Sequence, residues 1–254
     1  MQQYNEELVF ETVALAGEVL LASGAEIFRV TDTMQRIATA YGCPQLDSFV
    51  VSNGVLLSTG GQGRRYQAKV SHIPLGSSRL DRIDAVNQLS REITLGIHTP
   101  RQAYQRLREI QAMTTRSAWQ RLVACAIGSA AFAYVFGGNW ADALAAGIGG
   151  TVLCLYFFFL VRGRLSKIAL HISGGALATL TAIALLNLGL GTNLEIITAG
   201  AVAQLLPGMA FTNAIRDIAD EDYISGSVRL LDAMLVIFCI AAGVFLGGWF
   251  LGQL

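Results

Sequence analysis

The sequence predicts a membrane protein in which a cytoplasmic α+β domain, residues 1–116, is followed by a bundle of five transmembrane helices, residues 117–254. Charge divides the chain at this point, because the first part carries 12 Lys+Arg and 11 Asp+Glu and the second part only 6 and 7. The second part is almost continuously apolar, in stretches that approach the ~20 residues a helix needs to cross a bilayer. A backbone in hydrocarbon must satisfy its own hydrogen bonds, so five helices are the economical interpretation.

Two helices are predicted at the start of the chain. Apolar residues recur at helical spacing over residues 8–22 and again over residues 27–41. Ser23 stands three residues before Glu26, and this capping-box pattern predicts that the second helix starts there. Gly42 is expected to end it.

Three short runs then predict a small β-sheet. Residues 46–52 and 55–59 are rich in β-forming side chains and are joined by Asn53-Gly54, a strong hairpin signal. Residues 65–72 alternate apolar and polar side chains, as a half-exposed strand does. The glycine-rich run 60–63 lies between two of these strands, so we interpret it as a hairpin loop rather than a phosphate-binding loop.

Two more helices complete an ααβββαα order for the first domain. Apolar side chains from Leu80 to Ile93 repeat at helical spacing. A last helix is expected to begin with Thr99 as its cap and Pro100 at its first position, where the missing N–H is harmless.

Five apolar stretches alternate with loops that differ in charge. The stretches are residues 119–136, 142–161, 168–190, 196–215 and 230–251. Basic residues gather before the first stretch, in the second loop and in the fourth loop, whereas the first and third loops have none. Because basic loops mark the cytoplasmic side, the N-terminus is expected in the cytoplasm and the C-terminus in the periplasm.

Several function classes lack a sequence signal. No basic stripe accompanies a nucleic-acid-reading motif, and neither a Walker loop nor a dinucleotide-binding glycine pattern is present. The four cysteines are far apart and are interpreted as buried free thiols, and His72 and His98 have no ligand cluster nearby. We therefore expect no metal, no cofactor and no enzymatic activity.

The fourth apolar stretch combines a helix breaker with polar side chains. Pro207 removes a backbone donor and Gly208 loosens the backbone, so a kink is expected. The polar side chains that follow are Thr212, Asn213, Arg216 and Asp217. A charge at the centre of a membrane helix costs about 2.5–3.5 kcal/mol, which favours a substrate or translocation site here. For the two charged residues, anchoring at the cytoplasmic membrane surface is an equal alternative.

Eight further residues are weaker candidates with structural alternatives. They are Glu26, Arg29, Ser52, Asn53, His171, Ser225, Arg229 and Asp232. Glu26 fits a helix cap, and Ser52 and Asn53 fit left-handed turn positions. His171 could relay protons, but it also fits snorkelling toward the membrane surface or a hydrogen bond between helices. Two acidic residues at the starts of apolar stretches, Asp142 and Glu195, are explained by placement at the membrane interface.

Three parts of the sequence resemble the threonine/serine exporter family. They are residues 206–217 (LPGMAFTNAIRD) with Ser225-Gly226 and Arg229, residues 21–26 (LASGAE) with Arg29, and residues 48–54 (SFVVSNG). The resemblance covers both halves of the chain in order, and corresponds to the N-terminal part of the longer family members. It implies export of small polar metabolites across a bacterial inner membrane, driven by the proton motive force. It also implies a separate small multi-span membrane protein as the partner.

We interpret the chain as a subunit of a secondary exporter, with threonine, serine or a succinate-like dicarboxylate as its substrate. Thr212 and Asn213 would hydrogen-bond the substrate, Arg216 would attract its carboxylate, and Asp217 would orient Arg216 or carry a coupling proton. A membrane-anchored sensor or scaffold is the alternative from another class. An intramembrane hydrolase is disfavoured, because Ser52 or Ser225 with a distant histidine makes a thin case. Homo-oligomerisation is left open.

Overall fold

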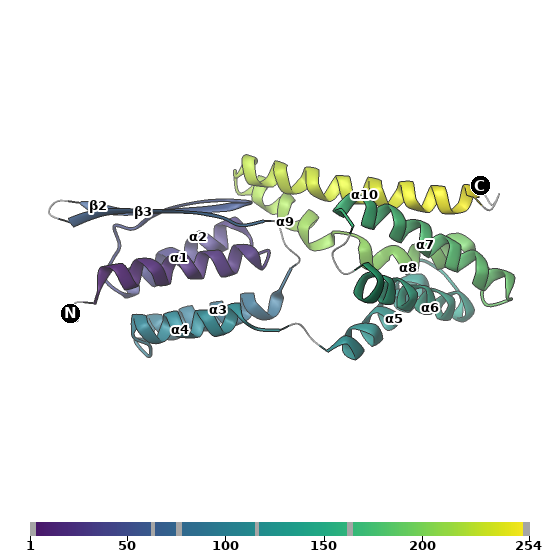
Figure 1. The fold of residues 1–254 in the computed structure, drawn as a ribbon, viewed down its shortest axis with the longest axis horizontal. Helices are drawn as coiled ribbons and strands as arrows, with labels where there is room; N and C mark the ends of the chain where they lie inside the picture. Colours follow the sequence, from purple (N-terminus) through teal and green to yellow (C-terminus); the bar gives the residue numbers. More distant parts are fainter. Residues whose placement is uncertain (1–3, 62–63, 75–77, 115–116, 162–164, 251–254) are drawn as a thin grey trace. The chain divides into compact units, whose positions relative to one another are not determined.

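The computed structural model describes residues 4–61, 64–74, 78–114, 117–161 and 165–250 as a mostly helical chain with one small three-stranded sheet (Figure 1). The chain divides into two compact units. Unit 1 combines Met1–Thr114 with Met209–Leu231, and unit 2 combines Thr115–Gly208 with Asp232–Leu254. The segment after Gly208 therefore packs with the N-terminal elements, although it follows them by almost a hundred residues.

Unit 1 is built around α1 (Glu6–Ala22), which is buried along most of its length because nearly every side chain after its first turn is apolar or small. The side chain of Asn5 caps its start by accepting a hydrogen bond from the Glu7 N–H. The second helix, α2 (Ile27–Ala40), buries one apolar stripe against α1. Both helices lie where the sequence predicted them.

The predicted capping box at the start of α2 is wrong. Ser23 is the C-cap residue of α1, and its hydroxyl donates to the Val19 carbonyl at 2.6 Å. Glu26 is the residue before α2, but its side chain makes no capping hydrogen bond. Its carboxylate is instead engaged by a guanidinium from a distant part of the chain, as described below.

Strands β1 (Asp47–Val51), β2 (Gly54–Gly61) and β3 (Arg64–His72) form an antiparallel sheet in chain order. β2 and β3 run alongside α1 and α2 in Figure 1, and the inward-facing Val55 and Leu57 of β2 are buried in the unit 1 core. The β1–β2 hairpin is confirmed. The predicted left-handed turn is not, because neither Ser52 nor Asn53 has a positive φ. Gln62 and Gly63 of the predicted glycine-rich loop lie outside the described residues.

Helices α3 (Leu80–Thr94) and α4 (Pro100–Gln111) close the described part of the N-terminal region. The predicted start of α4 is confirmed, with Thr99 and Gln102 forming a reciprocal capping box before Pro100. At the start of α3, the Arg79 guanidinium hydrogen-bonds Asp81 and lowers the pKa of that carboxyl to about 2.

Unit 2 is made of helices. They are α5 (Ala118–Val135), α6 (Trp140–Leu155) continued by the π-helix η1 (Tyr156–Val161), α7 (Lys167–Asn187), and α8 (Leu194–Val202) continued by the 3₁₀ turn η2 (Ala203–Leu205). The predicted break at Pro207 is confirmed, because the backbone leaves helical geometry at Leu206 and a new helix, α9 (Gly208–Ala219), begins after it. The last helix, α10 (Tyr223–Phe250), starts in unit 1 and continues through unit 2.

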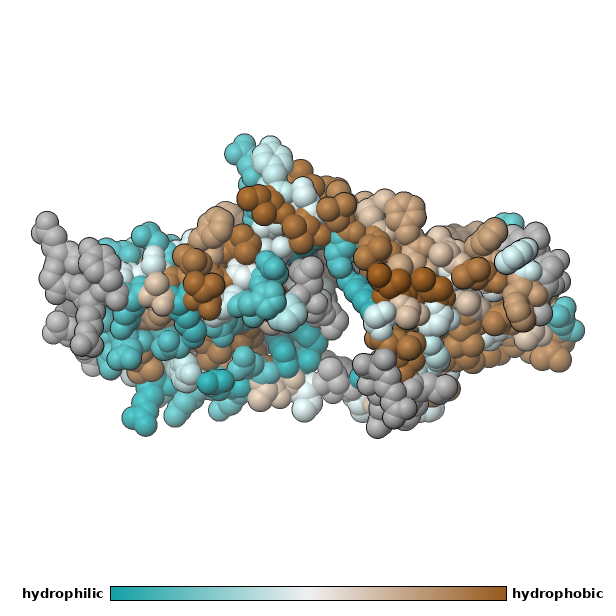
Figure 2. All heavy atoms as spheres, turned by 45° about the horizontal axis from the view of Figure 1, so that its top comes forward, coloured by the Kyte–Doolittle hydropathy of each residue, from teal (hydrophilic) through white to brown (hydrophobic). Residues whose placement is uncertain are grey.

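Among the described residues, three helices are long and apolar enough to cross a membrane: Trp140–Phe158, Lys167–Asn187 and Tyr223–Phe250. The bent pair Leu194–Leu205 and Gly208–Ala219 makes a fourth if it is one broken span. The prediction of five spans is not confirmed, since α5 has a polar first turn with Gln120 and Arg121. The face of unit 2 seen in Figure 2 is largely hydrophobic, whereas α1–α4 carry much of the hydrophilic surface.

Candidate functional site

The turn between α1 and α2 presents two backbone carbonyls outward. Gly24 adopts a left-handed φ of 75°, which a residue without a Cβ adopts at little cost. Its N–H donates to the Leu21 carbonyl at 3.0 Å, and the Ala25 N–H donates to the Leu20 carbonyl at 3.1 Å, in the pattern of a Schellman motif. The carbonyls of Gly24 and Ala25 are left to accept hydrogen bonds from elsewhere.

Two side chains from the C-terminal part of the sequence donate hydrogen bonds to these carbonyls. Asn213 of α9 is buried, and its Nδ2 donates to the Gly24 carbonyl at 2.9 Å. Arg229 of α10 is also buried, and one of its Nη atoms donates to the Ala25 carbonyl at 2.9 Å. The α1–α2 turn is thus hydrogen-bonded to both α9 and the beginning of α10 within unit 1.

Asp217 and Arg229 form a buried ion pair in the same place. A carboxylate oxygen of Asp217 lies 2.9 Å from the other Nη of Arg229, and their side chains are only 2% and 6% exposed. The second oxygen of Asp217 accepts a hydrogen bond from the Ile27 N–H at 3.3 Å. Asp217 therefore supplies the cap that Glu26 does not, and its negative charge lies at the positive end of the α2 dipole.

A second ion pair, between Glu26 and Arg216, is more exposed. The Arg216 side chain is 52% exposed and donates to the Glu26 carboxylate, which also lies 3.4 Å from Nε of Arg29. The expectation that Asp217 orients Arg216 is wrong, because Asp217 pairs with Arg229 instead.

Thr212 stands apart from Asn213, since adjacent residues of a helix point in different directions. Asn213 is buried, whereas Thr212 is exposed.

Small residues allow the start of α10 to approach α9. A Cβ added at Gly226 would lie 2.5 Å from the Ile218 side chain and 3.0 Å from the Ala214 carbonyl oxygen. The neighbouring Ser225 is fully buried, and its hydroxyl has no hydrogen-bond partner among the described residues. We call the set Glu26, Asn213, Arg216, Asp217 and Arg229, with the two turn carbonyls, the polar cluster.

Seven of the sequence-predicted residues thus lie in or beside the polar cluster: Glu26, Arg29, Asn213, Arg216, Asp217, Ser225 and Arg229.

Other predicted residues lie elsewhere. Ser52 and Asn53 form the β1–β2 turn, and Pro207 and Gly208 form the break before α9.

Two weaker candidates belong to unit 2, where both interact with the first residue of α7. His171 hydrogen-bonds the Lys167 carbonyl at 2.7 Å within its own helix, so of its two structural alternatives the hydrogen bond between helices is wrong. Asp232 accepts from Lys167 Nζ at 2.5 Å. The ion pair between Lys167 and Asp232 was not predicted.

Asp142 is the polar residue that the sequence reasoning most undervalued. It is 2% exposed and accepts hydrogen bonds from the Thr192 N–H at 2.6 Å, the Asn193 N–H at 3.0 Å and the Asn139 N–H at 3.3 Å. It thereby connects the α5–α6 and α7–α8 loops of unit 2. Its spacing three residues after Asn139 could have indicated this structural role, because the two residues form a capping box.

The Arg216 guanidinium gives the polar cluster a group that can bind a carboxylate. No group of three or more His, Cys, Asp or Glu side chains that could hold a metal ion occurs in the part of the chain that the structure describes. Arg216 keeps part of its guanidinium open to solvent, and a guanidinium binds a carboxylate through two parallel hydrogen bonds.

A family model described as "Putative threonine/serine exporter" matches residues 11–250 of the 254-residue chain. The matched region contains every residue of the polar cluster. No curated protein and no solved structure matches the chain.

Proposed function

The chain belongs to the threonine/serine exporter family, and from this we propose that it is a subunit of a secondary exporter for small polar metabolites. The single observation that carries this proposal is the family match over nearly the whole chain. The substrate would be threonine, serine or a succinate-like dicarboxylate, all of which carry a carboxylate. The chain would act without a catalytic step of its own.

We further propose a membrane arrangement for the two parts of the sequence. Residues 1–116 would form a cytoplasmic domain and residues 117–254 would provide five spans in a bacterial inner membrane, with the C-terminus in the periplasm. The alternation in the sequence of loops with and without basic residues supports this orientation. A small multi-span membrane protein would complete the exporter, and the chain could also self-associate.

Arg216 is the proposed entry point for the substrate carboxylate. Exposed ion pairs contribute only about 0–1 kcal/mol, so a substrate carboxylate can displace Glu26 from the guanidinium at small cost. The exposed Thr212 hydroxyl is close in sequence and would add a hydrogen bond to the substrate. The buried pair of Asp217 and Arg229 would keep α9 and α10 in place while the substrate replaces Glu26. Proton coupling is a separate proposed role of Asp217.

The two residues of the exposed pair should affect transport in opposite directions. Arg216→Gln should raise the KM about tenfold or more, because hydrogen bonds to a charged group contribute about 1.5–3 kcal/mol. Glu26→Gln should lower the KM by about two- to fivefold, because it removes the competing carboxylate. The measurement is initial counterflow rate against substrate concentration in proteoliposomes.

Arg29→Gln is the matched control, since Arg29 also pairs with Glu26 but leaves Arg216 untouched. Its KM should stay within about twofold of the original. Equal increases in KM for Glu26→Gln and Arg216→Gln would show that the ion pair acts as a structural unit. They would contradict the proposed displacement of Glu26 by the substrate carboxylate.

Asn213→Ala tests whether the amide serves structure, substrate or both. Loss of its bond to the Gly24 carbonyl leaves a buried acceptor unpaired, which should cost about 1–3 kcal/mol of folding free energy. If Asn213 also binds substrate, counterflow in the folded fraction should fall as well. A folded variant that reaches the membrane and exports at the normal rate would remove Asn213 from the substrate site.

The decisive experiment is counterflow of threonine, serine and succinate, each tested separately. Vesicles would contain this chain alone or together with the small candidate partner. Flux of one compound only in the co-reconstituted vesicles would support a two-subunit exporter and identify its substrate. Absence of flux of all three from folded, assembled protein would favour the membrane-anchored sensor or scaffold.

A further inference from the structure

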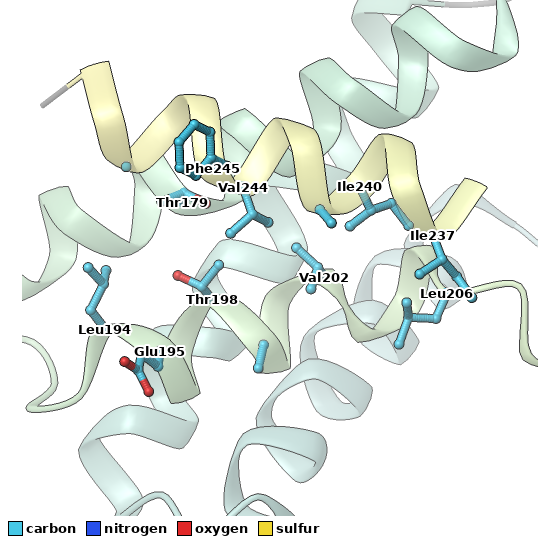
Figure 3. Close-up of a pocket in the computed structure, with 13 residues that line it drawn as sticks. Thr179, Leu194, Glu195, Thr198, Val202, Leu206, Ile237, Ile240, Val244 and Phe245 are labelled. Carbon is cyan, nitrogen blue, oxygen red and sulfur yellow. The ribbon is translucent and has the colours of Figure 1, made fainter. Parts of the chain in front are cut away.

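Unit 2 contains an apolar cavity of about 500 Å³ between α7, α8 and α10 (Figure 3). Its walls come from one turn of α7, from α8 and the chain that follows it as far as Leu206, and from α10 between Ile237 and Gly248. The volume lies within the range of small-molecule sites. Nearly all of the surface is hydrocarbon, so the cavity does not suit serine, threonine or a dicarboxylate.

The polar groups of the cavity are gathered toward one end. Glu195 and Thr198 come from the first turns of α8, while Val202 and Leu206 follow toward its far end. α10 runs in the opposite direction, because Ile237 lies near Leu206 and Phe245 lies near Leu194 (Figure 3). The cavity is therefore a groove with one polar end and a long apolar remainder.

Thr198 has an unsatisfied hydroxyl in this groove. The residue is 6% exposed, and its Oγ1 has no hydrogen-bond partner among the described residues. Thr179 and Thr181 of α7 behave differently, since each donates to a carbonyl of its own helix, four residues earlier. A buried hydroxyl without a partner costs free energy, so the geometry favours an acceptor supplied by a ligand.

Glu195 places a negative charge at the same end. The residue is exposed, and no ion pair to its carboxylate occurs in the described parts of the chain. Thr198 follows Glu195 by three residues, about 4.5 Å along the helix axis, and Val202 follows by about 6 Å more. Along α8 the groove therefore presents first a carboxylate, then a hydroxyl donor and then apolar walls.

We propose that this groove binds one acyl chain of a phospholipid whose headgroup carries a primary ammonium, as phosphatidylethanolamine does. The ammonium pairs with Glu195, the Thr198 hydroxyl donates to the ester carbonyl, and the acyl chain lies against Val202, Leu206 and Ile237. A primary ammonium can donate hydrogen bonds to the Glu195 carboxylate, which a quaternary ammonium cannot, and this difference selects the headgroup. The acyl chain is held by van der Waals packing against the apolar walls. The proposal is independent of which metabolite the protein exports.

The test is native mass spectrometry of the detergent-purified full chain, titrated with phosphatidylethanolamine or phosphatidylcholine of identical acyl chains. The original chain should retain one lipid and should prefer the ethanolamine form by about two- to fivefold, because only that headgroup adds hydrogen bonds to a solvent-accessible ion pair. Glu195→Gln should remove this preference while still retaining lipid. Glu109→Gln, at an exposed carboxylate of α4, is the matched control and should keep the preference.

Two further variants separate the hydroxyl from the groove. Thr198→Val should weaken retention of both lipids equally, and should not reduce the stability of the lipid-free protein, because no hydrogen bond is lost. Ala199→Leu or Ala241→Leu should fill the groove and abolish retention of both lipids.

Three outcomes would overturn the proposal. They are equal retention of the two lipids by the original chain, unchanged retention after the groove is filled, and a chain dimer that dissociates when the groove is filled. The last result would assign the groove to a second copy of the protein.

Discussion

Replacing Arg229 with methionine is expected to lower the free energy of unfolding by about 3–5 kcal/mol, because it leaves the Asp217 carboxylate buried without its counter-charge. The same change removes the hydrogen bond to the Ala25 carbonyl. The effect should appear as a lower denaturation midpoint of the full chain in detergent, followed by circular dichroism, with the slope of the transition unchanged.

The exposed ion pair provides the matched control for this prediction. Arg216→Met removes the partner of Glu26, but the Arg216 side chain is half in solvent, so the cost should stay below about 1 kcal/mol. Asp217→Asn combined with Arg229→Met should recover part of the loss, because asparagine can still accept from the Ile27 N–H without a buried charge. Equal losses for Arg229→Met and Arg216→Met would contradict the assigned roles of the two pairs.

Gly243→Ala is expected to destabilise unit 2 by about 1–3 kcal/mol or more, because α7 and α10 would have to move apart. A Cβ at Gly243 would lie 2.0 Å from the Ile172 carbonyl oxygen, and one at Gly175 would lie 2.5 Å from the Ile240 carbonyl oxygen. The opposed atoms belong to helix backbones, which cannot rotate away as a side chain can. Glycine at both positions therefore permits the two helices to cross closely.

Gly128→Ala in α5 is the matched control for Gly243→Ala, since a Cβ there would meet no atom within 4 Å. Alanine is a better helix former than glycine, so this variant should be as stable as the original or up to about 1 kcal/mol more stable. Thermal unfolding of the three proteins in the same detergent gives the comparison. A Gly243→Ala protein as stable as the Gly128→Ala protein would show that the helices do not cross this closely.

The features that sequence reasoning predicted correctly are local ones. Pro207 must interrupt a helix because it lacks an N–H, and Asn53-Gly54 between β-rich runs marks a hairpin. Thr99 followed by Pro100 marks the start of a helix. Each prediction depends on residues a few positions apart, where chain geometry fixes which groups meet.

The pairing within the polar cluster could not be predicted in this way. Ser23 and Glu26 have the spacing of a capping box, but Glu26 binds Arg216 and the cap of α2 comes from Asp217, 190 residues away from the Ile27 N–H. One role considered for Asp217 was to orient Arg216, whereas its carboxylate pairs with Arg229 on the next helix. Only the tertiary fold determines which carboxylate meets which guanidinium. The resemblance to a family identified most of the residues without indicating their partners.

The cap that Asp217 places on α2 has a consequence for the order of synthesis. Ile27 leaves the ribosome 190 residues before Asp217, and at typical elongation rates of about 5–20 residues per second the delay is about 10–40 s. During this time the N-terminal helices and sheet exist without the segment that completes their hydrogen bonds, while α5 to α8 are already emerging. The N-terminal part is therefore finished late, by the arrival of α9 and α10, and its assembly is coupled to successful synthesis of the apolar helices between them.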